Sequence, residues 1–212
     1  MLDRICGLLI GIAAMGIAAV LTIGPTRAED PSASDIANSL APKAPKTSLT
    51  RGLTLSDPNA ASGPNAARDQ QFIRGIVVEQ RPITVEERSQ IADIAKNKPG
   101  IDLEVNFDYN SATIGPQAID TLTKLGVALH DQRLKGALVL LAGHTDAKGS
   151  DAYNFDLSNR RAAAVKQFLI ERFNLAPENL CPVGFGKEHL KNTADPFAAE
   201  NRRVQVKNMS SQ

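Results

Sequence analysis

Tryptophan is absent from this 212-residue sequence, and aromatic residues make up only 4% of it. A sugar-binding surface built from stacked aromatic rings is therefore not expected. An excess of charge of one sign is also lacking, because 24 Lys and Arg are balanced by 23 Asp and Glu, for a formal net charge of +1. The sequence thus provides no large basic field of the kind that holds nucleic acid.

Residues that would support catalysis or metal binding are also scarce. After removal of an N-terminal segment the chain would keep only Cys181, which cannot form an internal disulfide and is interpreted as a small core residue. His144 and Asp146 are too few to make a metal site. No nucleophile–base arrangement, catalytic carboxylate pair or phosphate loop stands out. We therefore expect no enzymatic activity, no cofactor and no metal.

The N-terminal residues have the pattern of an export signal. An almost unbroken apolar run covers residues 5–24 and is followed by Thr26 and Ala28 at the small-residue positions of a cleavage site. We expect residues 1–28 to form a cleavable signal peptide. A retained membrane anchor is the alternative, because the run is long enough to span a bilayer. In both cases the rest of the chain is exported.

The region between this signal and the main domain is predicted in two parts. Residues 29–70 are rich in Ala, Pro and Ser, hold five of the twelve prolines and have little large apolar surface, so we expect a disordered spacer. Residues 71–99 are expected to form a short extension, with a strand at 72–79 and then a helix. Thr84 and Glu87 have the spacing of a capping box at the start of that helix.

Residues 100–208 have the patterns of an α/β domain, and residues 209–212 are expected to be a tail. An alternation of period two marks a half-buried strand over 101–107, and a continuous apolar run predicts a buried central strand. The remaining elements are expected as a helix opening at Pro116, the central strand at 137–142, a long helix at 151–173, and strands at 180–185 and 202–207. This order predicts helices packed on a mixed sheet.

The loop between the central strand and the long helix is the strongest candidate for a binding site. Ligands of α/β sheets usually bind at the carboxyl ends of strands, and a helix start offers free amides to an anion. Asn154, Ser158 and Arg161 share one helix face, and Asp146 precedes the helix. Asp146 and Arg161 would match the ammonium and carboxylate of a zwitterion. Their spacing alone also permits an internal salt bridge without any ligand.

The segment GHTDAKGSDAYNFDLSNRRAAAVKQFL, residues 143–169, closely resembles the signature of OmpA-like domains. These are the peptidoglycan-binding modules of outer-membrane proteins, peptidoglycan-associated lipoproteins and flagellar stators. Three further motifs, NFDYNSATI, GFGKEHL and ENRRVQV, occur in the family's order. The resemblance covers residues 100–208 and implies a βαβαββ sandwich with helices packed on a mixed sheet.

The resemblance also implies a ligand and its contacts. In this family the domain binds the diaminopimelate of the peptide stem, so Asp146 is expected to hold its ammonium and Arg161 its carboxylate. Thr145 and Asn154 match motif positions near the ligand. Arg202 matches a position that supports either the site or the sheet.

The expected function is non-covalent binding of peptidoglycan, which tethers a cell-envelope component to the wall. The expected location is the periplasm or outer membrane of a Gram-negative bacterium. Other envelope proteins are possible partners, nucleic acid is not, and the membrane is contacted only through residues 5–24 if these are retained. The alternatives are an envelope interaction scaffold and a stator-like membrane protein. A stator-like protein needs an ionisable residue in its membrane-spanning segment, and residues 5–24 contain no Asp, Glu, Lys, Arg or His.

Overall fold

The computed structural model describes residues 30–42, 64–79, 81–105, 107 and 110–210. The predicted signal peptide and its apolar run lie outside the described residues, as do residues 43–63 of the predicted spacer. No helix within the described ranges combines the length and hydropathy needed to cross a lipid bilayer.

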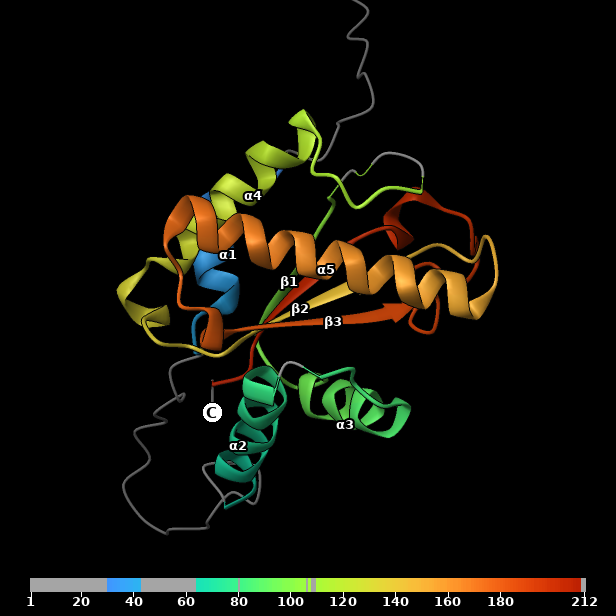
Figure 1. Ribbon diagram of the computed structural model, residues 1–212. Helices are drawn as coiled ribbons and strands as arrows, with labels where there is room; N and C mark the ends of the chain where they lie inside the picture. Colours follow the sequence, from blue (N-terminus) through green and yellow to red (C-terminus); the bar gives the residue numbers. More distant parts are fainter. Residues whose placement is uncertain (1–29, 43–63, 80, 106, 108–109, 211–212) are drawn as a thin grey trace, which may run out of the picture.

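Within the described residues, four strands form one mixed sheet in the order β1-β4-β2-β3 (Figure 1). The strands are β1 (Gly100–Leu103), β2 (Val139–His144), β3 (Leu180–Gly186) and β4 (Val204–Asn208). Strand β4 is antiparallel to both β1 and β2, whereas β2 and β3 are parallel and joined through helix α5 (Asp151–Phe173). The predicted order of elements and the mixed sheet are confirmed, although β1 is shorter than the predicted strand over 101–107.

Helices cover both faces of the sheet (Figure 1). Helices α1 (Ala33–Leu40), α4 (Pro116–Leu129) and α5 lie on one face, and α2 (Pro64–Glu79) and α3 (Val85–Ala95) lie on the other. A hydrophobic core lies on each face of the sheet, and alternate residues of β2 point into one or the other. Val139 and Leu141 pack against α4 and α5, and Leu140 packs toward α2 and α3. Every residue of β2 is therefore buried, which explains its continuous apolar run.

Local signals fix the helix boundaries on both faces. The capping box of α3 is present, with the Thr84 hydroxyl accepting from the Glu87 amide and the Glu87 carboxylate accepting from the Thr84 amide. Helix α5 begins at the predicted residue because the Ser150 hydroxyl accepts a hydrogen bond from the Tyr153 amide. The helix ends where Asn174 adopts a left-handed conformation with φ of 50°.

The prediction of a disordered spacer over 29–70 is wrong for the described part of that region. Residues 33–40 form α1, in which Ile36 and Leu40 are fully buried against α4 and the sheet. The Asn208 amide donates to the Leu40 carbonyl at 3.0 Å, so the helix is also held by β4. An isolated helix of this length is marginal in water, so tertiary packing stabilises α1. Its local signals are only the cap at Ser32 and one apolar pair at i, i+4, which the average composition of the segment conceals.

The predicted strand at 72–79 is also wrong, because these residues belong to α2, which includes residues 64–70 of the predicted spacer. Ile73, Ile76 and Val77 are buried at the i, i+3, i+4 spacing of a helix face, while Val78 is 70% exposed. The β-branched residues suggested a strand, but their burial follows the helical period. Residue Met209 of the predicted tail is buried in the same core.

Two glycines bring the first half of α5 into direct contact with the sheet. A Cβ atom on Gly143 of β2 would lie 2.4 Å from the Ser158 carbonyl oxygen, and one on Gly184 of β3 would lie 2.4 Å from the Asn159 amide nitrogen. The Gly186 amide donates to the Ser158 hydroxyl at 2.9 Å, and the Gly184 amide donates to the Asn159 side chain at 2.8 Å. This contact fixes the position of α5 at the carboxyl ends of β2 and β3.

Candidate functional site

A cleft of about 980 Å³ opens where β2 ends and α5 begins. Its lining consists of Phe107, Asn110, Thr145, Asp146, Lys148, Gly149, Ser150, Tyr153, Asn154, Leu157, Arg161, Phe197 and Arg202. The five residues predicted from the sequence to bind a ligand are all among them. Charged and apolar side chains therefore share one concave surface at the expected edge of the sheet.

Arg161 provides a fixed cation in the wall of the cleft. Its side chain extends from the buried face of α5 and is only 7% exposed. The Nε atom donates to the Ser111 carbonyl at 3.1 Å, and the guanidinium carbon lies 4.8 Å from the centre of the Phe107 ring. Burial lowers the pKa of Arg161, but an arginine remains protonated at any physiological pH. These contacts hold the guanidinium in one orientation in the wall of the cleft.

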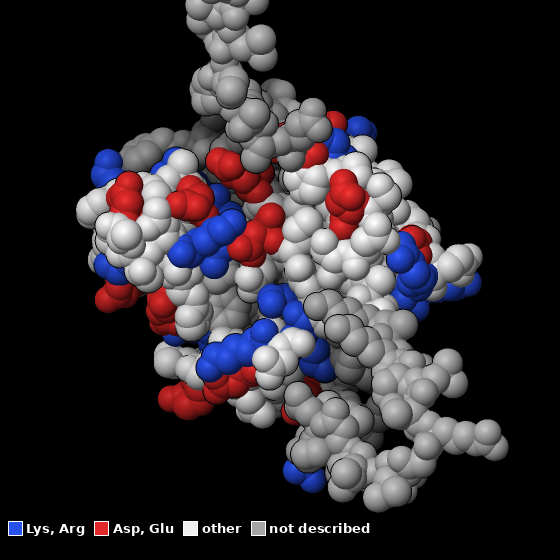
Figure 2. Space-filling view, turned by 180° about the vertical axis from the view of Figure 1, so that it is seen from behind, with Lys and Arg blue, Asp and Glu red and all other residues white. Residues whose placement is uncertain are grey.

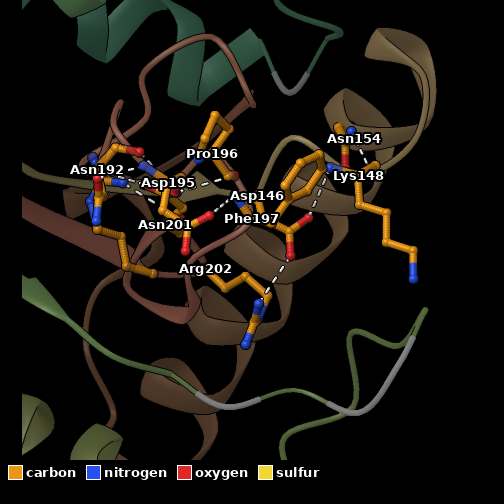
Figure 3. Close-up of polar contacts among 10 residues, drawn as sticks. Asp146, Lys148, Asn154, Asn192, Asp195, Pro196, Phe197, Asn201 and Arg202 are labelled. Atoms are coloured by element: carbon orange, nitrogen blue, oxygen red, sulfur yellow. Dashed lines mark hydrogen bonds and ion pairs between the residues drawn. The ribbon is translucent and has the colours of Figure 1, made fainter.

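Asp146 provides the anion, and its partner is not the Arg161 that the spacing permitted. Among the described residues its ion pair is with Arg202, at 3.0 Å between Oδ2 and Nη1 (Figure 3). Its other oxygen accepts from the Lys148 amide at 3.1 Å. The internal Asp146–Arg161 salt bridge that the spacing permitted is therefore not formed. Arg202, which the resemblance left between a site role and a sheet role, lies in the cleft.

Thr145 and Asn154 lie deeper in the wall than the charged residues. Asn154 is 1% exposed and its side-chain amide donates to the Lys148 carbonyl at 2.9 Å, which holds the loop that follows β2 (Figure 3). Thr145 is 2% exposed, and among the described residues its hydroxyl has no hydrogen-bond partner. The geometry therefore gives Asn154 a positioning role in the loop that carries Asp146.

Aromatic residues complete the cleft, and the sequence patterns did not reveal them. Phe107 supports Arg161, and the Tyr153 hydroxyl donates to the Asn110 side chain at 3.0 Å. Phe197 comes from a distant loop that reaches the site because the Ala147 amide donates to the Pro196 carbonyl at 3.0 Å. A backbone hydrogen bond between segments about 50 residues apart cannot be predicted from composition or periodicity.

The charges of the site suit a small ligand that carries both signs. One carboxylate, two guanidiniums and the Lys148 ammonium sum to +2, so a ligand with a carboxylate and an ammonium can meet an opposite charge at each end. On the face turned away from the viewer in Figure 1, acidic and basic side chains are interspersed and no large area of one sign is visible among the described residues (Figure 2). Among the described residues, no group of three or more His, Cys, Asp and Glu could hold a metal ion.

His144, at the end of β2, gives the fold a dependence on pH. It is 4% exposed, stacks on Phe185 at 5.5 Å and has no hydrogen-bond partner for either ring nitrogen among the described residues. Burial, followed by the charges of Arg203 and His189, lowers the pKa of His144 from 6.5 to about 3. The unfolded chain therefore takes up a proton at a higher pH than the folded chain.

This difference predicts a loss of stability in mild acid. Because the folded pKa lies below the unfolded one, the contribution of His144 is complete above pH 6.5 and is lost as the pH falls from 6.5 toward 3. Between pH 7 and pH 4.5, the wild type is expected to lose about 2 kcal/mol more unfolding free energy than His144→Gln. Urea titrations at the two pH values measure this difference, with the surface variant His130→Gln as control. Equal losses in wild type and His144→Gln would contradict the prediction.

The fold and the cleft together define a class: an α/β domain with a charged cleft at the start of its crossover helix. Residues 106–203 match the sequence profile of the OmpA family, and this part of the chain is an OmpA-like domain. The match confirms the family resemblance found in the motifs.

Individual relatives match the same region. The peptidoglycan-associated lipoprotein of Pseudomonas aeruginosa is 37% identical over 103 residues, which cover 48% of this chain and 59% of the relative. Outer membrane porin F of Pseudomonas fluorescens is 34% identical over 108 residues, which cover 50% of this chain and 32% of the relative. The matched part thus spans about a third to three fifths of these relatives' length.

Solved structures with a similar fold include the OmpA-like domain of FopA1 from Francisella tularensis. It has a TM-score of 0.45 and 22% identity, with coverage of 50% of this chain and 70% of that one. The peptidoglycan-associated lipoprotein of Burkholderia pseudomallei has a TM-score of 0.41 and 24% identity, with coverage of 49% and 86%.

Proposed function

We propose that this protein binds peptidoglycan non-covalently through the cleft and thereby tethers a cell-envelope component to the wall, without catalysing a reaction. The observation that carries the proposal is the arrangement of Asp146, Arg161 and Arg202 in one cleft of an OmpA-like domain. Similarity to a peptidoglycan-associated lipoprotein supports the choice of polymer. The corresponding location is the periplasm or outer membrane of a Gram-negative bacterium.

The ligand group that fits the charges is the zwitterionic end of diaminopimelate in a peptide stem. Its ammonium would lie against Asp146, and its carboxylate would take two parallel hydrogen bonds from Arg161. Arg202 holds the Asp146 carboxylate in position at 3.0 Å and adds a second positive charge near the ligand carboxylate. The partly closed cleft strengthens these contacts, because buried charges are less screened than exposed ones.

Binding to intact wall material tests this proposal. The full chain is expected to sediment with purified peptidoglycan sacculi, and stem peptides that contain meso-diaminopimelate are expected to release it. Stem peptides with amidated diaminopimelate should compete poorly, because amidation removes the negative charge that faces Arg161. Incubation should release no soluble wall fragments, since a binding module breaks no bond. A chain that stays in the supernatant, or that releases fragments, would contradict the proposal.

A further inference from the structure

Phe197 is an exposed aromatic side chain at the edge of the cleft. Its side chain is 62% exposed, although it lines the same concave surface as the charged residues. Among the described residues, the other exposed large apolar side chains, which are Val78, Val85, Ile119 and Val127, do not line the cleft. An apolar ring left in contact with water at a binding site has a free face that a ligand can cover.

The loop that carries Phe197 is held in one arrangement. Asn201 is fully buried, and its side-chain amide donates to the carbonyls of Asn192, Asp195 and Pro196 at 3.3, 3.0 and 3.2 Å (Figure 3). The Phe197 amide donates to the Asp195 carboxylate at 3.1 Å. Because the loop is already held, contact with the ring requires little further loss of backbone conformational entropy.

The same loop is attached to the segment that carries Asp146. The bond from the Ala147 amide to the Pro196 carbonyl joins the residue after Asp146 to the residue before Phe197. Figure 3 shows the Phe197 ring beside Asp146, on the side of the cleft toward Lys148. A ligand whose ammonium reaches Asp146 would therefore lie within reach of the ring.

We propose that Phe197 is a specificity-determining residue, on which the hydrocarbon chain that joins the zwitterionic end of the ligand to the peptide stem packs. This inference rests on the proposed function and adds a requirement to it. The charged residues select a zwitterion, and the ring selects one that is carried on a methylene chain. Small free amino acids lack that chain and would bind more weakly.

Calorimetric titration of the full-length protein with a sugar-free stem tripeptide ending in meso-diaminopimelate tests the inference. Covering one to two methylene groups is worth on the order of tenfold in affinity, so Phe197→Ser is expected to bind the tripeptide about tenfold more weakly. Phe197→Leu keeps an apolar side chain and should stay within about threefold of wild type. Val127→Ser, which removes an exposed apolar side chain outside the cleft, should bind like wild type.

A second titration, with the same peptide attached to its disaccharide, separates the possible contacts. The inference requires the same loss for both ligands in Phe197→Ser. A loss confined to the ligand with sugar would assign the ring to the glycan and overturn the inference. Unchanged binding in Phe197→Ser, together with lost binding in Asp146→Ala, would overturn the inference and leave the proposed function standing. If wild type binds neither ligand, the proposed function itself fails.

Discussion

Arg161→Ala is expected to weaken binding to peptidoglycan by roughly 30-fold to several thousand-fold, which corresponds to about 2–5 kcal/mol. The substitution leaves the ligand carboxylate without its counter-charge in a partly closed cleft. Arg161→Lys should also lose most binding, because an ammonium cannot form two parallel hydrogen bonds to a carboxylate. Nor can it keep both the contact with the Ser111 carbonyl and the position of the guanidinium over the Phe107 ring.

Cosedimentation with sacculi over a range of protein concentrations measures this effect. The matched control is Arg160→Ala, which removes a neighbouring arginine of α5 that pairs with Asp156 at 2.8 Å outside the cleft. Arg160→Ala should bind like wild type. If Arg161→Ala keeps a native circular dichroism spectrum and still sediments like wild type, the assignment of Arg161 to the ligand is wrong. Lost binding accompanied by unfolding would instead indicate a structural role.

Asp146→Ala should cause a loss similar to that of Arg161→Ala, because it removes the counter-charge of the ligand ammonium. The double variant should be little weaker than either single one, since both residues act on one ligand. Arg202→Ala should have a smaller effect, because the Arg202 side chain is 45% exposed and its charge is better screened. Additive losses in the double variant would show that the two residues act independently.

Gly143→Ala is expected to lower the free energy of unfolding by about 3 kcal/mol or more, the upper range for overpacking a tight contact. The new Cβ atom would lie 2.4 Å from the Ser158 carbonyl oxygen, which is backbone and cannot rotate away. Helix α5 would have to move off the sheet, and it carries Arg161 with it. Binding should therefore weaken together with stability.

Urea denaturation measures this change, and Gly75→Ala is its matched control. Gly75 lies in α2 with open space around it, so alanine there should stabilise the protein by about 0.5–1 kcal/mol through helix propensity. A Gly143→Ala protein that unfolds within 0.5 kcal/mol of wild type would contradict the close contact between α5 and β2.

Most of the central domain could be predicted from the sequence because its signals are local. The bounds of α5 follow from Ser150 and Asn174, and the burial of β2 follows from an unbroken apolar run. Helix α2 was missed because its β-branched residues favour a strand, and only tertiary packing shows that their burial has a helical period. Helix α1 was missed because one cap and one apolar pair are too few to stand out from a polar background.

The sequence predicted which residues line the candidate site, but not which of them form ion pairs with one another. Motifs identified five residues that do line one cleft, including Asp146 and Arg161. The ion pair between Asp146 and Arg202 joins positions 56 residues apart, and the hydrophobic periodicity of the sequence cannot predict such a contact. Phe197 was missed for the same reason, since only the folded loop brings it to the cleft.

The docked helix α1 determines where a mechanical load would enter this domain. If residues 5–24 are retained as a membrane anchor, eight residues separate Gly24 from Ala33, and fully extended they span at most about 30 Å. A pull on the chain ahead of α1 would act first on the burial of Ile36 and Leu40 and on the bond from Asn208, not on the sheet. Detachment of α1 would release the eight residues 33–40, about 26 Å of extended chain, while the cleft stayed folded. If the proposed wall binding holds, this short helix would be the first element to unfold under a load between membrane and wall.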